Sequence, residues 1–144
     1  TKIMIEIIKF NFSEEDLREE AFKIRHKVFV EEQNCPPEIE YEFEEISTHF
    51  LLKYNNTPIC TSRYRKTNEG IKLERFAVLK EYRKKGIGHK ILKYMLNDLK
   101  DFKGLIYMHA QVDVIPFYEK MGFIKQGGKF EEAFIMHYKM ILKR

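Results

Sequence analysis

The sequence predicts an α/β protein in which a mixed β-sheet carries helices on its faces, in the order β-α-β-β-β-α-β-α-β. Three observations lead to this prediction. Short β-branched segments recur along the chain, apolar stripes at helical spacing separate some of them, and a basic turn with two glycines joins a strand to a helix. A chain of 144 residues is typical of one domain, and we expect a single domain over residues 1–144.

The first third of the chain contains one strand and one helix. The segment KIMIEIIK (Lys2–Lys9) is partly alternating and predicts a strand. Ser13 followed by Glu-Glu-Asp is a good helix start, with acids that favour the positive helix end. We expect the helix to end near Val28–Phe29, since Cys35–Pro37 (CPP) breaks any continuation. The apolar stripe of this helix consists of Leu17, Ala21, Ile24 and Val28.

Three strands in succession follow. THFLLKY and PICTSRYR flank Asn55-Asn56-Thr57, which predicts a hairpin, and IKLERFAVL (Ile71–Leu79) is the third strand. A helix over 89–100 then leads to the strand GLIYMHAQ (Gly104–Gln111), so these two strands can be parallel. A short helix, VIPFYEKMGF, ends at Gly122, and EAFIMHYKMIL is the final strand.

Composition and charge limit the classes of function. A net charge of +4 is modest for a dedicated nucleic-acid binder, and no aromatic stacking platform is interleaved with the basic stretch Lys80–Lys93. The two cysteines form neither a metal-binding spacing nor a disulfide framework. No segment approaches the length of a membrane span or has the pattern of a signal peptide. We therefore expect a cytoplasmic protein without a metal site, a membrane partner or a nucleic-acid partner.

The segment YRKKGIGHKI (Tyr82–Ile91) is the most informative stretch. It is neither a P-loop nor a dinucleotide fingerprint, because Ile91 stands where the third glycine of GxGxxG would be. A helix start offers free N–H groups and a positive dipole, so cations and glycines at this point favour a pyrophosphate site. The alternative is an ordinary basic turn. The predicted strand before this segment and the predicted helix after it favour a pyrophosphate site over an ordinary basic turn.

Two segments resemble motifs of the GCN5-related N-acetyltransferase (GNAT) superfamily. Because the order of the predicted elements also matches, the resemblance covers nearly the whole chain. FAVLKEYRKKGIGHKILKYM is similar to its motif A, (Arg/Gln)-x-x-Gly-x-(Gly/Ala) between a strand and a helix, and IPFYEKMGF is similar to motif B, where a Tyr-bearing helix precedes Gly-Phe. IRHKVFVEEQ (Ile24–Gln33) and the tail FEEAFIMHYKM resemble the bacterial ElaA/YjcF-like subgroup. The resemblance implies the GNAT fold, with a central sheet splayed between the strands at 71–79 and 104–111.

The resemblance implies acetyl-CoA as the cofactor. The glycine turn would hold its pyrophosphate, and the pantetheine arm would lie along the splayed strand as an added strand. His89 departs from the Arg, Ser or Thr often found there, so its contact would be made by the main chain. The matching positions are Phe76, Ala77, Val78, Arg83, Lys84, Lys85, Gly86, Ile87, Gly88 and His89.

The resemblance also implies direct attack of a primary amine on the thioester in a ternary complex. Tyr118 matches the motif B tyrosine, which would protonate the departing thiolate. His137 is the best candidate for the general base. A glyphosate acetyltransferase of related build has a His in this tail strand, and that His serves as its base. Glu74 or Glu32 acting through water are alternatives, and His109 could line the same cleft. Cys35 and Cys60 do not have the setting of a nucleophile.

The acceptor cannot be named from the sequence. Candidate acceptor-binding residues are Arg25, Glu32, Gln33, Arg75 and Gln111. Arg25 could pair with an acidic group of the substrate or with a nearby glutamate. The acceptor could be a small amine or a peptide or protein amine. Homodimers are frequent in the superfamily, and a non-catalytic acyl-CoA-binding sensor is the alternative function.

Overall fold

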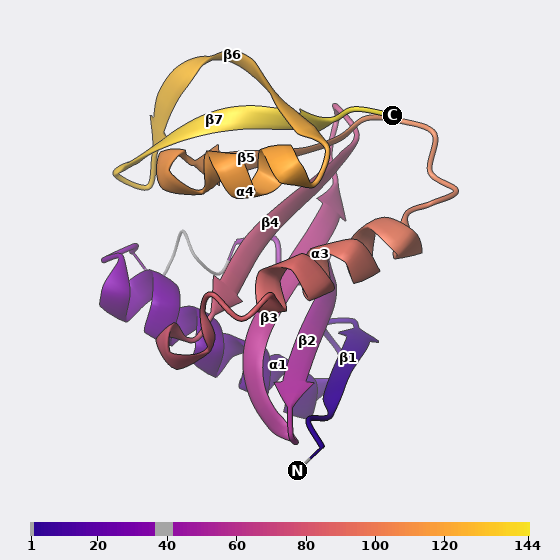
Figure 1. The fold of residues 1–144 in the computed structure, drawn as a ribbon, viewed down its shortest axis with the longest axis vertical. Helices are drawn as coiled ribbons and strands as arrows, with labels where there is room; N and C mark the ends of the chain where they lie inside the picture. Colours follow the sequence, from indigo (N-terminus) through magenta and orange to yellow (C-terminus); the bar gives the residue numbers. More distant parts are fainter. Residues whose placement is uncertain (1, 37–41) are drawn as a thin grey trace.

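The computed structural model describes residues 2–36 and 42–144, and seven strands of these residues form one sheet (Figure 1). The strands are β1 (Ile5–Phe10), β2 (Thr48–Tyr54), β3 (Thr57–Lys66), β4 (Ile71–Val78), β5 (Ile106–Gln111), β6 (Phe123–Glu132) and β7 (Ile135–Leu142). The helices are α1 (Glu15–Arg25), the π-helical η1 (His26–Glu32), the short 3-10 turns η2 (Lys80–Tyr82) and η3 (Val112–Val114), α3 (Ile87–Asp98) and α4 (Ile115–Lys120). Among the described residues, no helix is both long and apolar enough to cross a lipid bilayer.

The sheet is mixed, as predicted. Its order is β1-β2-β3-β4-β5-β7-β6, and all neighbours are antiparallel except β4 and β5, which α3 connects as a parallel pair. The predicted hairpin between β2 and β3 is confirmed, with Asn55 and Asn56 at positive φ. Figure 1 shows two arms, β1–β4 below and β5–β7–β6 with α4 above.

Helices cover both faces of the sheet because side chains alternate along each strand. Phe50 and Leu52 of β2 point to one face and pack in the cluster that contains Ile91 and Met95 of α3. Leu51, between them, points to the other face and packs in the cluster that contains Ala21 and Ile24 of α1. The predicted α/β architecture with helices on both faces is therefore confirmed.

The structure adds a strand that the predicted order lacks. β6 has Gly127 and Gly128 at its centre, and residues 124–129 are all exposed. Its register with β7 shifts between Gln126 and Phe130. An edge strand held by backbone pairing needs no apolar alternation, so the sequence pattern did not reveal it. The final strand also starts later than predicted, at Ile135, because Ala133 and Phe134 form a turn with positive φ.

The first helix also differs from its predicted limits. Ser13 does not cap it; the N-cap is Glu14, and the Ser13 hydroxyl donates to Asn11 instead. The helix does not end near Val28–Phe29 but continues in π geometry to Glu32. Both Val28 and Phe29 are buried, which the wider π turn allows for consecutive residues. The helical segment thus reaches the region where β4 and β5 meet.

β4 and β5 pair over only three residues each. Ile71–Leu73 lies beside Ile106–Met108, and beyond this point β4 continues along β3 while β5 continues along β7. The predicted splay of the central sheet is therefore confirmed. The edge of β4 from Glu74 to Val78 that faces β5 has no strand partner within the described part of the chain.

A bulge in β4 lies at the start of this unpaired edge. Thr61 pairs with Ala77 and Arg63 pairs with Glu74, so Arg75 and Phe76 both lie opposite Ser62. Arg75 has a φ of 59°, which costs a non-glycine residue about 1–3 kcal/mol. Such a conformation persists only where its surroundings hold it.

A buried ion network holds the bulge. The Nε of Arg63, which is fully buried, donates to Glu74 Oε2 at 2.8 Å, and its Nη1 donates to Glu44. Arg25 Nη1 donates to the same Glu44 carboxylate at 2.9 Å, and Arg65 Nε donates to Glu74 Oε2 at 3.0 Å. The network connects α1, the segment before β2, β3 and β4.

The ionised form of Glu74 depends on this network. Burial alone would raise the pKa of the carboxyl, but the charges of Arg63, Arg75, Lys72 and Arg65 outweigh it and lower the pKa to about 2. Because the pKa in the fold lies below the ordinary 4.5, Glu74 contributes stability above pH 4.5 and loses that contribution as the pH falls toward 2.

Glu74→Gln should therefore reduce the free energy of unfolding at pH 7 by about 3–5 kcal/mol, because it leaves buried cations without their counter-charge. The deficit relative to wild type should shrink between pH 4.5 and pH 2, and chemical denaturation at several pH values measures it. Glu69→Gln is the matched control, since Glu69 pairs with Lys139 at the surface, where solvent screens the pair, and its loss should change stability much less than that of Glu74. Equal free energies of unfolding for E74Q and wild type at pH 7 would contradict the role of Glu74 as the counter-charge of this network.

Candidate active site

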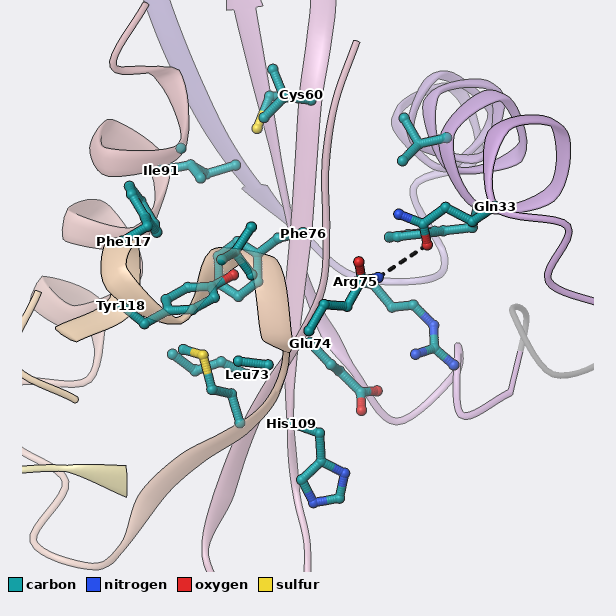
Figure 2. Close-up of a pocket in the computed structure, with 18 of the residues that line it drawn as sticks. Gln33, Cys60, Leu73, Glu74, Arg75, Phe76, Ile91, His109, Phe117 and Tyr118 are labelled. Atoms are coloured by element: carbon teal, nitrogen blue, oxygen red, sulfur yellow. Dashed lines mark hydrogen bonds between the residues drawn. The ribbon is translucent and has the colours of Figure 1, made fainter. Parts of the chain in front are cut away.

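A cavity of about 940 Å³ lies where β4 and β5 separate. Its wall combines residues of β4 and β5 with η1, the start of α3, α4 and the turn between β6 and β7. Figure 2 shows Phe117 and Tyr118 on one side of this cavity, and Gln33 and Arg75 on the opposite side. The two arms of the sheet thus meet around one space, and most of the predicted site residues line it.

The glycine turn forms one end of the cavity. Lys84 and Gly86 adopt left-handed conformations with φ of 64° and 78°, and α3 begins directly after Gly86. No side chain of the described residues caps this helix, so its first N–H groups face the turn without an intrahelical acceptor. Adjacent N–H groups in such a turn, with the helix dipole behind them, are suited to bind a phosphate. The turn residues that line the cavity are Arg83, Lys84, Gly86, Ile87, Gly88 and His89, whereas Lys85 does not.

Arg83 connects this turn to two other elements. Its Nε donates to the carbonyl oxygen of Val78 at 2.8 Å, and its Nη2 donates to Glu32 Oε1 at 2.9 Å. Glu32 itself does not line the cavity. Glu32 thus lies beside the glycine turn and positions the Arg83 guanidinium between η1 and the end of β4.

The unpaired edge of β4 leads from the glycine turn toward the middle of the cavity. Phe76 and Val78 line the cavity, whereas Ala77 points to the other face and packs in the α1 cluster. Main-chain N–H and C=O groups along this edge have no strand partner in the described residues, and buried groups of this kind need one. An extended molecule with amide groups could pair with them as an added strand.

Tyr118 of α4 lies beside this edge. Its ring contacts Phe76 and Phe117, with centroid separations of 6.0 Å and 5.1 Å. Burial raises the pKa of the Tyr118 hydroxyl above its ordinary value, and the thiol of Cys60 adds to the shift. The hydroxyl therefore stays protonated throughout the physiological range and can act only as a proton donor there.

His137 of β7 lines the same cavity from the other arm of the sheet. Its Nδ1 lies 2.7 Å from the carbonyl oxygen of Ile135. A carbonyl only accepts, so Nδ1 carries the hydrogen and Nε2 of the neutral ring is left to accept a proton. Nε2 lies 4.0 Å from Glu132 Oε2. This arrangement suits a general base.

The remaining predicted residues fall into two groups. Gln33 and Gln111 bridge the cavity, because Gln111 Nε2 donates to Gln33 Oε1 at 3.0 Å (dashed line in Figure 2). Arg75 and Glu74 also line it, although the low pKa of Glu74 makes this carboxylate a weak base. Arg25 is buried against Glu44 and does not line the cavity. Of the two interpretations of Arg25, the structure thus shows the pair with a glutamate.

Several cavity residues were not predicted. Cys60 of β3 lines it beside Tyr118, and burial raises the pKa of its thiol. Lys72 and Arg65 lie around Glu74, and alternation along β4 could have placed Lys72 on the same face as that glutamate. Glu132 was predicted as the first residue of the final strand, EAFIMHYKMIL, whereas the structure places it at the end of β6, before the turn that leads to β7. Among residues 2–36 and 42–144, no group of three His, Cys, Asp or Glu side chains is arranged to hold a metal ion.

Comparisons with known proteins agree with this geometry. Residues 11–144 match the family described as Acetyltransferase (GNAT) domain. The N-acetyltransferase YjcF of Bacillus subtilis (strain 168) is 37% identical over 133 residues, which cover 90% of this chain and 94% of YjcF. The crystal structure of Escherichia coli ElaA superposes with a TM-score of 0.87 at 25% identity, covering 97% of this chain and 100% of ElaA.

One further structure is informative because of its ligand. The PaiA N-acetyltransferase of Thermoplasma acidophilum, in complex with coenzyme A, superposes with a TM-score of 0.71 at 18% identity, covering 98% of this chain and 99% of PaiA.

These findings confirm the resemblance that motifs A and B and the ElaA/YjcF-like segments indicated. The family match covers more than nine tenths of the chain, and the relatives and structural neighbours match over nearly their full length. The chain has the fold and the family profile of acyl-CoA-dependent N-acyltransferases. It therefore belongs to the GNAT acetyltransferase family.

Proposed function

We propose that the protein transfers an acetyl group from acetyl-CoA to a primary amine by direct attack in a ternary complex. The observation that carries this proposal is a continuous path through one cavity: a phosphate-binding helix start, an unpaired strand edge, a buried tyrosine hydroxyl and a histidine with an available nitrogen. Each part suits one part of the donor or one step of the transfer.

The residues present fit acetyl-CoA. The N–H groups of Ile87 and Gly88, with the charge of Arg83, would bind the diphosphate. The edge of β4 at Phe76–Val78, which has no strand partner in the described residues, would pair with the amides of the pantetheine arm. When bound, acetyl-CoA supplies an activated acyl carbon on a thioester. The CoA complex of PaiA, a protein of the same fold, supports this choice of donor.

His137 and Tyr118 would handle the protons. An alkylamine has a pKa of about 10 and arrives as an ammonium ion, so His137 Nε2 takes one proton and frees the lone pair. The nitrogen then bonds to the acyl carbon, and the carbon–sulfur bond breaks. Tyr118 gives its proton to the departing sulfur and is reprotonated by the second proton of the new amide nitrogen. One proton in total is released from His137 to solvent.

Neither cysteine suits an acyl-enzyme route. Cys60 is fully buried, and burial raises the pKa of its thiol, which disfavours the thiolate nucleophile. Cys35 is buried, and its sulfur donates to the Pro36 carbonyl oxygen. The transfer is therefore assigned to direct attack by the amine.

Incubation with acetyl-CoA and a panel of amines tests the proposal, with release of free CoA thiol as the readout. We expect thiol release that depends on the amine, and a fold stabilised by about 2.7 kcal/mol at an acetyl-CoA concentration of 100 times its dissociation constant. Tight acetyl-CoA binding without thiol release from any amine would instead favour the non-catalytic sensor. The absence of any stabilisation would contradict both functions.

Gly86→Ala should weaken CoA binding at least about tenfold, the effect of losing one hydrogen bond to a charged group. An alanine at a φ of 78° either strains the turn or moves its N–H groups away from the diphosphate. Gly127→Ala is the matched control, because Gly127 has a φ of 83° and equally open space but lies in β6. Both variants should lose about 1–2 kcal/mol of stability. Calorimetric titration with CoA measures the two dissociation constants. Equal values for the two variants would contradict the assignment of the glycine turn to the diphosphate.

Tyr118→Phe should lower kcat about 10²- to 10⁴-fold with little change in the dissociation constant of acetyl-CoA. The substitution removes only the hydroxyl and keeps the ring contacts with Phe76 and Phe117. Because burial raises the pKa of Tyr118, wild-type kcat should not decline from loss of this acid below about pH 10. Steady-state rates from pH 6 to 10 measure both effects, and an unchanged kcat in Y118F would exclude Tyr118 as the acid.

A further inference from the structure

Three ionisable side chains from three neighbouring strands meet on the wall of the cavity. His109 lies on β5, Glu132 on β6 and His137 on β7, and all three line the cavity. Glu132 Oε1 lies 3.0 Å from His109 Nδ1, and Glu132 Oε2 lies 4.0 Å from His137 Nε2. One carboxylate thus faces both rings, with one oxygen toward each.

Packing and hydrogen bonds fix the orientation of each group. Phe130 stacks on the His137 ring at 5.9 Å and meets the edge of the His109 ring at 5.0 Å. His137 Nδ1 donates to the Ile135 carbonyl, and His109 Nδ1 donates to Glu132. These hydrogen bonds leave His109 Nε2, His137 Nε2 and Glu132 Oε2 as acceptors, and of these His137 Nε2 and Glu132 Oε2 face each other at 4.0 Å.

The distance between these two acceptors leaves room for one shared donor. A separation of 4.0 Å is too long for a direct hydrogen bond. A nitrogen about 2.9 Å from each atom would complete a triangle with an angle of ~90° at the nitrogen, which two N–H bonds of a tetrahedral ammonium ion can approach.

The charge of Glu132 suits the same donor. Its hydrogen bond with His109, followed by the charge of Lys72, lowers the pKa of this carboxyl against the opposing effect of burial, so it is ionised at neutral pH. Glu74, by contrast, is surrounded by Arg63, Arg65, Arg75 and Lys72 within the fold. Of these two glutamates, Glu132 is the one whose carboxylate has an oxygen directed at the predicted base.

We propose that Glu132 is an acceptor-binding residue that holds the substrate as an aliphatic ammonium ion between its Oε2 and His137 Nε2, and that His109 positions Glu132. The proposal rests on the proposed function only for the role of His137 as the base. It names the acceptor class as aliphatic primary amines, which are protonated at neutral pH, in preference to arylamines, which are neutral.

Glu132 would also take part after proton transfer. When His137 Nε2 removes a proton from the ammonium ion, the charge moves to an imidazolium that still faces the Glu132 carboxylate. The amine is then neutral and is held less tightly by Glu132, so its lone pair is free to attack. The Glu132 side chain is 40% exposed, which gives the proton on His137 a route to solvent.

The first test measures binding and needs no acetyl transfer. The protein is titrated with ethylammonium chloride while the Cε1–H signals of His109 and His137 are followed by NMR. Tetramethylammonium chloride, which has no N–H donor, serves as the control salt. We expect saturable shifts of both signals with ethylammonium alone, and at least tenfold weaker binding in Glu132→Gln, the effect of losing one hydrogen bond to a charged group.

Glu131→Gln is the matched control variant, because Glu131 is the exposed neighbour on β6 and points to the other face. E131Q should bind ethylammonium with the same affinity as wild type. The ammonium site would be overturned by unsaturable shifts in wild type, by equal shifts with tetramethylammonium, or by wild-type binding in E132Q.

The positioning role of His109 has its own readout. His109→Gln keeps an N–H donor for Glu132 and should retain ethylammonium binding within a few fold, whereas His109→Leu should weaken it as E132Q does. Equal losses in both variants would show that the ring acts through packing alone and would overturn the positioning role.

Turnover separates this proposal from the proposed function. With the alkylamine that reacts fastest in the panel, E132Q should raise KM at least tenfold, and E131Q should not change it. If the wild-type protein acetylates the amine but its histidine signals show no saturable shifts, the ammonium site is overturned and the acetyltransferase function stands. Saturable shifts that E132Q abolishes would support the site even if no amine were acetylated.

Discussion

The short pairing between β4 and β5 is the constraint on which the rest of the structure depends. The ladder stops after Leu73 and Met108, because β4 stays with β3 to Val78 while β5 stays with β7 to Gln111. Each strand is held on its outer edge, so the gap cannot close by simple re-pairing. The gap creates the cavity and leaves an edge of β4 that has no strand partner in the described part of the chain. The binding path therefore follows from strand pairing.

Buried charge keeps this opening in place. The bulge at Arg75 carries a strained backbone, and the Arg63–Glu74 and Arg63–Glu44 pairs tie it to β3 and to the segment before β2. A network of this kind contributes mainly geometry, because the desolvation of its charges offsets much of their attraction. The same charges that lower the pKa of Glu74 make it a poor proton acceptor. A structural role thus accounts for Glu74 better than a catalytic one.

Local pattern and the family motifs predicted residues that the structure brings to one cavity. Gly86 and Gly88 between a strand and a helix start indicated the phosphate turn, and motif B placed Tyr118. The sequence did not predict β6, since an edge strand with Gly127 and Gly128 at its centre carries no apolar alternation. Glu132 was therefore assigned to the start of the final strand and not to β6, and it was not predicted as a site residue. Arg25 could not be resolved between substrate and glutamate, because pairing with Glu44 depends on contacts distant in the sequence.

In the proposed function, the two halves of the cavity would therefore recognise their ligands differently. The proposed donor half would use main-chain N–H and C=O groups at α3 and β4, which many sequences can form; ElaA keeps the fold at a TM-score of 0.87 with only 25% identity. The proposed acceptor half would use side chains of β5, β6 and β7, and the β6 register shift between Gln126 and Phe130 sets which β6 residue faces His137. A one-residue change in that shift would turn Glu132 to the other face and present Glu131 instead. With the proposed roles, a change in the β6–β7 register would alter acceptor choice and leave donor binding the same.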